Sequence, residues 1–211
     1  MNDLVIVGNG GFAREVAWLV ERINLEKKTW NFLGFIDNKL NEKNVIGDDR
    51  FIINYKDELN VAIAIGTSHI RRKLYQNYKQ NPNIKFPNLF DPSVLFSKKI
   101  TFGIGNIICA GTILTVDISI GNFNIINLDC TVGHDAVIGD FITVNPSVNL
   151  SGSTEVGSGT NIGTGTQVIQ GVSIGFDSII GAGAVVNKDL PDNCTAVGVP
   201  AKVIKIHNNK E

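Results

Sequence analysis

Three histidines are the side chains of this 211-residue chain best suited to acid–base chemistry, and they lie far apart in the sequence. His69, His134 and His207 show none of the spacings at which histidines share a metal ion, so the sequence predicts no metal site. His134 differs from the other two because Asp135 follows it directly. A carboxylate beside an imidazole can orient the ring and raise its basicity, as in general-base catalysis. His134 and Asp135 are therefore the candidate catalytic residues.

A cysteine lies four residues before this pair, which raises the possibility of a Cys–His nucleophile. Cys130, however, occupies a position that small residues share elsewhere in the chain, such as Ala136 and Ala184. We interpret it as structural, so we expect chemistry without a covalent intermediate on this thiol. With only three cysteines and no CxxC spacing, the sequence predicts reduced thiols rather than a disulfide framework or a zinc site.

A glycine-rich turn near the N-terminus is a second candidate site. The β-branched run from Leu4 to Val7 predicts a strand, and apolar residues at helical spacing predict a helix from Phe12 to Ile23. Between them, residues 8–13 read GNGGFA and match the G-x-G-x-x-G/A pattern, in which backbone N–H groups and the helix N-terminus approach a phosphate. The candidate phosphate-binding residues are Gly8, Asn9, Gly10, Gly11 and Phe12.

The next two predicted strands end in further candidate residues. Residues 32–36 lead into Asp37, and an acidic residue at that place would hold a ribose hydroxyl, so Asp37 and Asn38 are candidate ribose or base ligands. Residues 61–65 lead into Gly66. Ligands of open parallel sheets bind at the carboxyl ends of strands, so Gly66 is expected in the same site.

The α/β pattern stops near Lys85, which leaves room for about half of a two-lobed NAD-binding sheet. We therefore prefer one nucleotide of a larger ligand to a whole dinucleotide, although the fingerprint alone would also allow an NAD-dependent oxidoreductase. Near the end of the third predicted strand lies a basic cluster of His69, Arg71, Arg72 and Lys73, at the start of a helix predicted from Ile70 to Tyr78. We interpret this cluster as a solvated helix face and assign it no role.

Beyond residue 95, a large apolar residue recurs at every sixth position for sixteen consecutive steps. This hexapeptide period fits a short strand and a corner, and three such faces close a triangular coil of eighteen residues. The pattern predicts about five stacked coils with these side chains directed inward. The positions are Phe96, Phe102, Ile108, Leu114, Ile120, Ile126, Val132, Ile138, Val144, Leu150, Val156, Ile162, Val168, Ile174, Ile180 and Val186.

The two patterns divide the chain into an α/β Rossmann-like domain, residues 1–86, and a parallel β-helix with its C-terminal cap, residues 87–211. Because the ends of a solenoid must be covered, the N-terminal domain and the tail from Lys188 onward are the expected caps. His134 follows the inward-facing Val132 by two residues. It is therefore expected at an outward-facing corner, where it is accessible.

Composition limits the function classes. Hydrophobic residues make up 43% and charged residues 18% of the chain, with a mean hydropathy of +0.11, which favours a folded protein over a disordered chain or a nucleic-acid binder. Residues 100–200 contain one Lys or Arg against eight Asp or Glu. No apolar run approaches the roughly 18 residues that span a bilayer, and the N-terminus lacks the basic region of a secretion signal. We expect a cytoplasmic protein without a membrane or nucleic-acid partner.

Together these motifs resemble the NeuD/PglD-like hexapeptide-repeat sugar acetyltransferases, a family of nucleotide-sugar N-acetyltransferases and sialic acid O-acetyltransferases. The resemblance spans nearly the whole chain. It is carried by VIVGNGGFA, AIAIG followed by IRRK, the hexapeptides, NLDCTVGHD and the terminal VGVPAK. It implies a left-handed β-helix, acetyl-CoA as co-substrate, no metal, and a homotrimer whose grooves between neighbouring subunits bind acetyl-CoA.

The resemblance also implies roles for individual residues. His134 aligns with a general base, Asp135 with its partner and Asn127 with a polar contact in the same cleft. The glycine turn, Asp37, Asn38 and Gly66 would hold the nucleotide of the sugar. Gly152 aligns with a glycine whose N–H faces the thioester carbonyl. The positions that align with the surroundings of acetyl-CoA are Thr143, Thr164 and Ala182.

Two residues depart from the family pattern. Phe12 stands where relatives that act on UDP-linked 4-amino sugars often have a histidine. Thr143 stands at a second position where many relatives have a histidine. The function implied is acetyl-CoA-dependent N-acetylation of a nucleotide-linked amino sugar for bacterial surface glycans. O-acetylation of a sugar such as sialic acid stays open. Two alternatives of other classes are the NAD-dependent oxidoreductase and a non-catalytic solenoid binding module.

Overall fold

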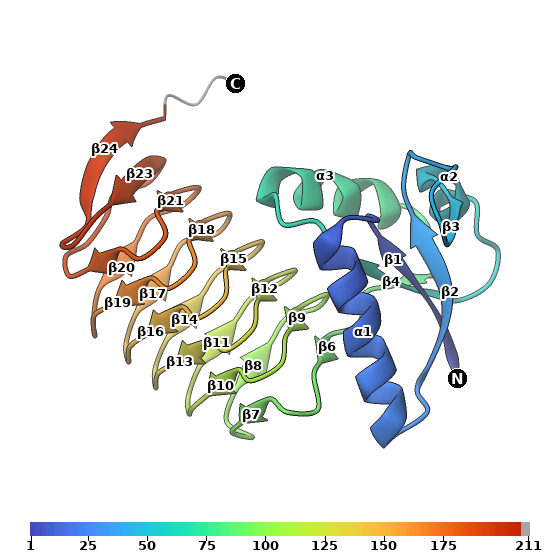
Figure 1. Ribbon diagram of the computed structural model, residues 1–211, viewed down its shortest axis with the longest axis horizontal. Helices are drawn as coiled ribbons and strands as arrows, with labels where there is room; N and C mark the ends of the chain where they lie inside the picture. The colour runs from blue at the N-terminus through green and yellow to red at the C-terminus, as the bar shows by residue number, and fades with distance from the viewer. Residues whose placement is uncertain (208–211) are drawn as a thin grey trace.

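Alternating apolar strands and helices fold the first third of the chain into a parallel sheet with helices on both faces (Figure 1). The computed structural model describes residues 1–207. The elements of this domain, in chain order, are β1 (Asn2–Val7), α1 (Gly11–Glu26), β2 (Trp30–Ile36), β3 (Val45–Gly47), α2 (Asp49–Ile53), β4 (Leu59–Ile63), α3 (Ser68–Tyr78) and β5 (Ile84–Lys85). The three strands and two helices expected from the sequence are present, and β3, α2 and β5 add to them.

The strand order of this sheet, β3-β2-β1-β4-β5, has a topological switch point at β1. Leu4 and Ile6 of β1 pack in the cluster that contains α1, whereas Val5 and Val7 pack in the cluster that contains α2 and α3. The chain thus moves to one side of β1 with β2 and to the other side with β4. In open parallel sheets, ligands bind beyond the carboxyl ends of the strands at such a switch point.

The hexapeptides form a left-handed β-helix of two-residue strands, which confirms the predicted fold class. Each strand pairs in parallel with the strand eighteen residues further on, as Ile113 does with Thr131. Face I holds β6 (Leu89–Phe90), β9 (Ile107–Ile108), β12 (Ile125–Ile126), β15 (Thr143–Val144), β18 (Asn161–Ile162) and β21 (Ile179–Ile180), followed by β23 (Cys194–Val197) and β24 (Lys202–Ile206). Face II holds β7 (Leu95–Phe96), β10 (Ile113–Leu114), β13 (Thr131–Val132), β16 (Asn149–Leu150), β19 (Gln167–Val168) and β22 (Val185–Val186). Face III holds β8 (Thr101–Phe102), β11 (Ser119–Ile120), β14 (Val137–Ile138), β17 (Glu155–Val156) and β20 (Ser173–Ile174).

The corners between these faces share one backbone conformation. Every sixth residue from Gly105 to Gly183 has a positive φ, the left-handed region that Gly and Asp tolerate best. Asp135, at φ 59°, is one of these residues. The repeat of the sequence is therefore also a repeat of the backbone, and this fixes where each corner side chain leaves the prism.

The inward-facing residues from Ile108 to Val186 are buried, as expected. The first two apolar positions are exceptions, because Phe96 is 49% exposed and Phe102 is half-buried. The rings of Phe90, Phe96 and Phe102 lie 5.0–5.9 Å from one another and close this end of the prism themselves.

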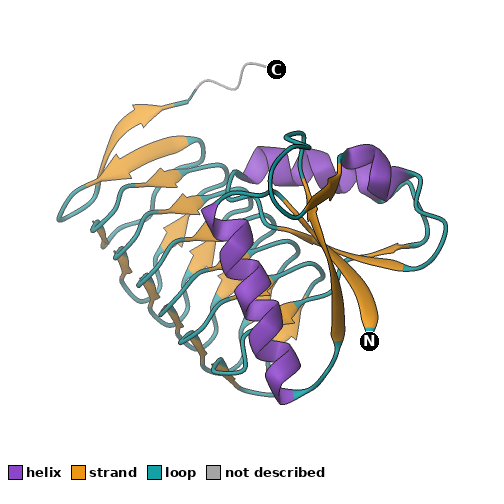
Figure 2. Ribbon diagram, turned by 45° about the vertical axis from the view of Figure 1, so that its right-hand side comes forward, coloured by secondary structure: helices purple, strands orange, loops and turns teal. Residues whose placement is uncertain are grey.

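The expected role of the N-terminal domain as an end cap was wrong. Helix α1 lies along the early coils (Figure 2) and packs on the outward-facing Leu89, Ile107 and Ile125 of face I. The prism is therefore covered from the side. At the other end, the tail does cover the last coil, since Cys194 and Ala196 belong to the core of the β-helix.

An ion pair ties α1 to the start of the β-helix. Arg22 donates from Nε and Nη2 to the two carboxylate oxygens of Asp91 at 2.6 and 3.1 Å, and the Asp91 side chain is only 1% exposed. Burial raises the pKa of the Asp91 carboxyl, but hydrogen bonds from Arg22 and Ser93 outweigh it and hold this pKa below its usual value. The ionised form of Asp91 is thus stabilised in the folded state.

We expect Asp91→Asn to lower the free energy of unfolding at pH 7 by roughly 1–3 kcal/mol, the contribution typical of hydrogen bonds to a charged group. Because the folded-state pKa is depressed, the wild type has this advantage above the unfolded-state pKa and loses it as pH falls through the folded-state pKa. Urea unfolding at pH 7 and at low pH should show the two proteins converge. Arg50→Gln, which breaks an exposed pair with Asp48, is the control with little expected change. An equal difference at both pH values would contradict this account.

Candidate active site

The glycine turn opens the backbone at the carboxyl end of β1. Gly8 has φ 100°, and a Cβ at this position would lie 2.8 Å from Cδ1 of Ile65. Gly10 caps α1 without a side-chain hydrogen bond, and a Cβ on Gly10 would meet nothing within 4 Å. The N-terminus of α1 is therefore uncapped and has open space beside Gly10, which is the arrangement that suits a phosphate.

A cavity of about 150 Å³ lies beside this turn. It brings together Gly8, Asp37 and Asn38 as the sequence predicted, and Gly66 lies just beyond the same strand edge, whereas Asn9 to Phe12 do not line it. The lining residues are Val7, Gly8, Ile36, Asp37, Asn38, Asp49, Ile65, Ile70 and Leu74. Apolar walls with carboxylates at the margin suit one planar, hydrogen-bonding group such as a nucleobase.

Sequence reasoning missed Asp49 in this cavity. The hydroxyl of Tyr78 donates to Oδ1 of Asp49 at 2.5 Å, and burial raises the pKa of Tyr78, so the donor stays protonated. Asp48 caps the short helix α2 and so places Asp49 in its first turn. The Gly47-Asp48-Asp49 run is an ordinary helix-start signal, and nothing in it points to a ligand.

His134 and Asp135 form an exposed pair at the corner between faces II and III. Nδ1 of His134 lies 2.7 Å from Oδ2 of Asp135, with the two side chains 52% and 61% exposed. When Nδ1–H donates to the carboxylate, Nε2 carries the free electron pair and can accept a proton. The ring lies directly over Gly152, because a Cβ on that glycine would be 2.5 Å from Nε2.

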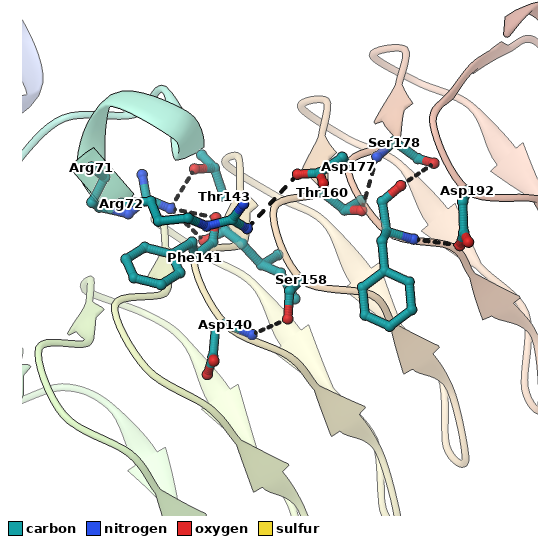
Figure 3. Close-up of polar contacts among 12 residues, drawn as sticks. Arg71, Arg72, Asp140, Phe141, Thr143, Ser158, Thr160, Asp177, Ser178 and Asp192 are labelled. Carbon is teal, nitrogen blue, oxygen red and sulfur yellow. Dashed lines mark hydrogen bonds and ion pairs between the residues drawn. The ribbon is translucent and has the colours of Figure 1, made fainter. Parts of the chain in front are cut away.

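The backbone of Gly152 is also available as a donor. At the corner between faces III and I, the N–H groups at the same position of the repeat donate to side chains of the following coil. Ser158 Oγ accepts from Asp140 N, and Asp192 Oδ1 accepts from Phe176 N, both at 2.8 Å (Figure 3). Within residues 1–207, the N–H of Gly152 donates to no acceptor. The N–H of Gly152 thus has no hydrogen-bond partner in this part of the chain, and it belongs to the residue on which the His134 ring lies.

The resemblance implies Asn127 as a polar contact in the cleft of His134, and Thr164 and Ala182 as acetyl-CoA contacts, but these three lie at a different corner. Asn127, Thr164 and Ala182 belong to the corner between faces I and II, where Thr164 and Ala182 are exposed and Asn127 accepts a hydrogen bond from the Leu128 N–H at 2.8 Å. Face II separates this corner from His134. One chain therefore does not bring the two groups together.

The structure places Thr143 inside the contact between the two domains. Thr143 is only 4% exposed. Its Oγ1 donates to the carbonyl of Gly66 at 2.7 Å and accepts from Nη2 of Arg71 at 3.2 Å. This position leaves Thr143 no free surface for acetyl-CoA.

Arg71 likewise differs from expectation. The interpretation of its basic cluster as a solvated face was wrong for this residue, which is 1% exposed. The spacing of Arg71, Leu74, Tyr75 and Tyr78 along α3 is the signal that could have revealed it, because it places Arg71 on the buried stripe of the helix.

Cys130 lies in the core of the prism and is fully buried. Burial raises the pKa of its thiol to about 11, and Sγ donates to the carbonyl of Asn145 at 3.2 Å. We expect Cys130→Ala to lower the free energy of unfolding by about 1 kcal/mol and to leave turnover unchanged. Urea unfolding and acetyl-transfer rates measure the two effects. Loss of turnover in a folded Cys130→Ala variant would instead indicate that Cys130 acts as a nucleophile.

Two features are absent from the described residues, 1–207. No group of three or more His, Cys, Asp or Glu side chains there could hold a metal ion. No helix in this part of the chain is long and apolar enough to cross a membrane.

The left-handed β-helix with its exposed His–Asp pair, joined to a Rossmann-like domain, defines a hexapeptide-repeat acyltransferase. The family model of the PglD N-terminal domain matches residues 3–78. PerB of Caulobacter crescentus, solved with CoA and GDP-perosamine, is 32% identical over 97% of this chain and 98% of its own, with a TM-score of 0.86. WeeI of Acinetobacter baumannii is 30% identical over 97% and 100%, also with a TM-score of 0.86. The chain belongs to the PglD/NeuD-like family of sugar acetyltransferases, which confirms the resemblance.

Two further relatives extend this comparison. The acetyltransferase domain of PglB from Neisseria gonorrhoeae, also solved with acetyl coenzyme A, is 29% identical over 97% of this chain and 100% of its own, with a TM-score of 0.89. Galactoside O-acetyltransferase of Escherichia coli is 50% identical over 40 residues. That match spans only 20% of the curated relative's length and 19% of this chain.

Proposed function

We propose that this protein transfers the acetyl group of acetyl-CoA to the amino group of a nucleotide-linked amino sugar. The observation that carries the proposal is the exposed His134–Asp135 pair, whose ring lies against Gly152, a residue whose N–H donates to no acceptor within residues 1–207. The relatives support the two substrates: PglB was solved with acetyl coenzyme A, and PerB with CoA and GDP-perosamine.

The nucleotide is held by the N-terminal domain. The open first turn of α1 receives the diphosphate, and the cavity with Asp37 and Asn38 receives the ribose and base. Asp49 adds a carboxylate that can accept a hydrogen bond from the base. The sugar then extends past Gly66 toward the β-helix.

Transfer is direct. The sugar amine attacks the thioester carbonyl carbon, Nε2 of His134 accepts the proton from the amine, and the C–S bond breaks to release CoA as thiolate, which is then protonated. Asp135 orients the ring and stabilises the imidazolium. The N–H of Gly152 donates to the tetrahedral oxyanion, a contribution typically of about 3–4 kcal/mol.

The working enzyme is a homotrimer with acetyl-CoA between neighbouring copies. His134 and Gly152 lie at one corner of the prism, and Asn127, Thr164 and Ala182 lie at another. A single ligand can reach both groups when the corners come from two different chains. The supporting observation is that face II separates these groups within one chain.

The test is thiol release from acetyl-CoA by the purified protein with a panel of UDP-, GDP- and dTDP-linked amino sugars, with His134→Ala beside it. Release with one sugar, lost in the variant, supports the proposal. Release that needs only a sugar hydroxyl, with a product labile to mild alkali, would instead indicate O-acetylation. No thiol release with any of the amino sugars or hydroxyl acceptors would overturn the acetyltransferase proposal. Sedimentation of the protein tests the trimer.

A further inference from the structure

A buried arginine lies where the two domains meet (Figure 3). Arg71 is 1% exposed, and none of its hydrogen-bond partners in the described chain is a carboxylate. Burying a cation is costly unless its donors are satisfied, and here five oxygens satisfy them besides the Thr143 hydroxyl. The acceptors are the carbonyls of Ile65, Gly66, Phe123, Phe141 and Ile142.

These acceptors come from both domains. Nη1 of Arg71 donates to the Ile65 and Gly66 carbonyls, in the loop that follows β4. Nε donates to Phe123 and Nη2 to Phe141, each at 2.8 Å, at the corner between faces III and I. Because the guanidinium is planar and rigid, one group fixes the loop and the corner in both distance and orientation.

A second bond fixes the same loop. Oγ1 of Thr143, on β15 of the prism, donates to the Gly66 carbonyl at 2.7 Å and accepts from Arg71 at 3.2 Å. The Gly66 carbonyl therefore accepts from Arg71 within its own domain and from Thr143 across the domain boundary. Gly66 itself is exposed, and a Cβ there would meet nothing within 4 Å, so side-chain packing does not hold it.

Aromatic rings surround this polar centre. Tyr75 of α3 lies 4.4 Å from the ring of Phe123, which stacks on Phe141 at 5.3 Å and an interplanar angle of 5°. Water is thereby kept from the Arg71 bonds, which strengthens them and makes them hard to replace. The neighbouring Arg72 instead lies at the rim, over the Phe141 ring and 3.8 Å from Asp177 (Figure 3).

We propose that Arg71, with Thr143, is a positioning residue for acetyl transfer. It holds the nucleotide-binding loop at Gly66 in a fixed place against the β-helix, so that an amine bound by the N-terminal domain arrives aligned with the acetyl group. The inference rests on the proposed function, since it assumes that the loop carries the sugar nucleotide. Misplacement of a reacting group by about 1 Å can lower a rate by up to roughly 10²-fold even when both ligands bind.

The test compares graded changes at the two residues. We expect Thr143→Val, which removes the bond to Gly66, to lower kcat about tenfold, and Arg71→Lys, which keeps the charge but loses the fork, to lower it up to roughly 10²-fold. The KM values for both substrates should stay within about twofold of the wild type. Thr143→Ser keeps the hydroxyl and should restore kcat. Arg72→Gln is the matched control on the same helix and should leave kcat unchanged.

Hydrogen exchange of the amides at residues 64–67 gives a readout that needs no activity. Thr143→Val should accelerate this exchange, and Thr143→Ser should not. Wild-type kcat and exchange in a folded Thr143→Val would overturn the proposal, as would a change in KM without one in kcat. If Arg71→Lys does not fold, the comparison of Thr143→Val with Thr143→Ser is the test. If the wild type transfers no acetyl group, the proposed function fails, and exchange still decides whether this contact holds the loop.

Discussion

His134→Ala is expected to lower turnover by roughly 10²–10⁴-fold, the usual contribution of a general base. The imidazole is the group that can take the amine proton beside Gly152, with Nδ1 held by Asp135 at 2.7 Å. Because the ring is half exposed at a corner, its removal leaves the core intact, so the melting temperature and acetyl-CoA affinity should change little. Thiol release from acetyl-CoA measures the rate.

A control variant and a variant of the partner residue accompany this change. His69→Ala removes another exposed histidine, on α3, and should leave turnover unchanged. Asp135→Asn should also reduce turnover, because an amide can no longer favour the tautomer with the proton on Nδ1. The loss should be smaller than in His134→Ala, since the imidazole is still present. Wild-type turnover in a folded His134→Ala would remove this residue from the mechanism.

Gly152→Val is expected to lower turnover by roughly 10²–10³-fold, comparable to the loss of an oxyanion donor. A Cβ at this position would lie 2.5 Å from Nε2 and 2.6 Å from Cε1 of His134. The ring would have to leave its place, and the added side chain would cover the N–H that we assign to the oxyanion. Turnover and acetyl-CoA binding are both measured, since the valine also fills the groove.

Gln170→Ala is the matched control for this variant, because Gln170 is exposed and lies eighteen residues further on, at the equivalent position of the next coil. It should retain full activity. A double variant with His134→Ala separates two routes of damage. If Gly152→Val acts by displacing the His134 ring, it should lower turnover much less in the His134→Ala background than in the wild type. Full additivity would show that the backbone donor alone accounts for the loss.

Much of the β-helix was predictable because its rules are local. A six-residue period repeats the same strand and corner, so the burial of Ile108 to Val186 and the small-residue slot of Cys130 follow from counting. The same counting placed His134 at an accessible corner next to Asp135. The prediction failed at Phe96, because the first coil has no preceding coil to cover it.

The glycine turn was predictable for the same reason, since strand, turn and helix are neighbours in the chain. Gly8, Asp37 and Asn38 meet in one cavity because the carboxyl ends of adjacent parallel strands lie together. Asp49 was not predictable, because it enters that cavity from a short helix whose sequence carries only a capping signal.

The sequence by itself thus determined the two architectures, the accessible histidine–carboxylate pair and the open glycine turn, all of which depend on residues close in the chain. Tertiary structure alone decided how the domains meet. Arg71 bonds to Phe123 and Phe141, 52 and 70 residues away, and Thr143 bonds to Gly66, 77 residues away. Contacts over such distances depend on how α3 docks on one corner of the prism. No local pattern encodes that docking, so a residue that resembled a solvated charge became the buried link between the two domains.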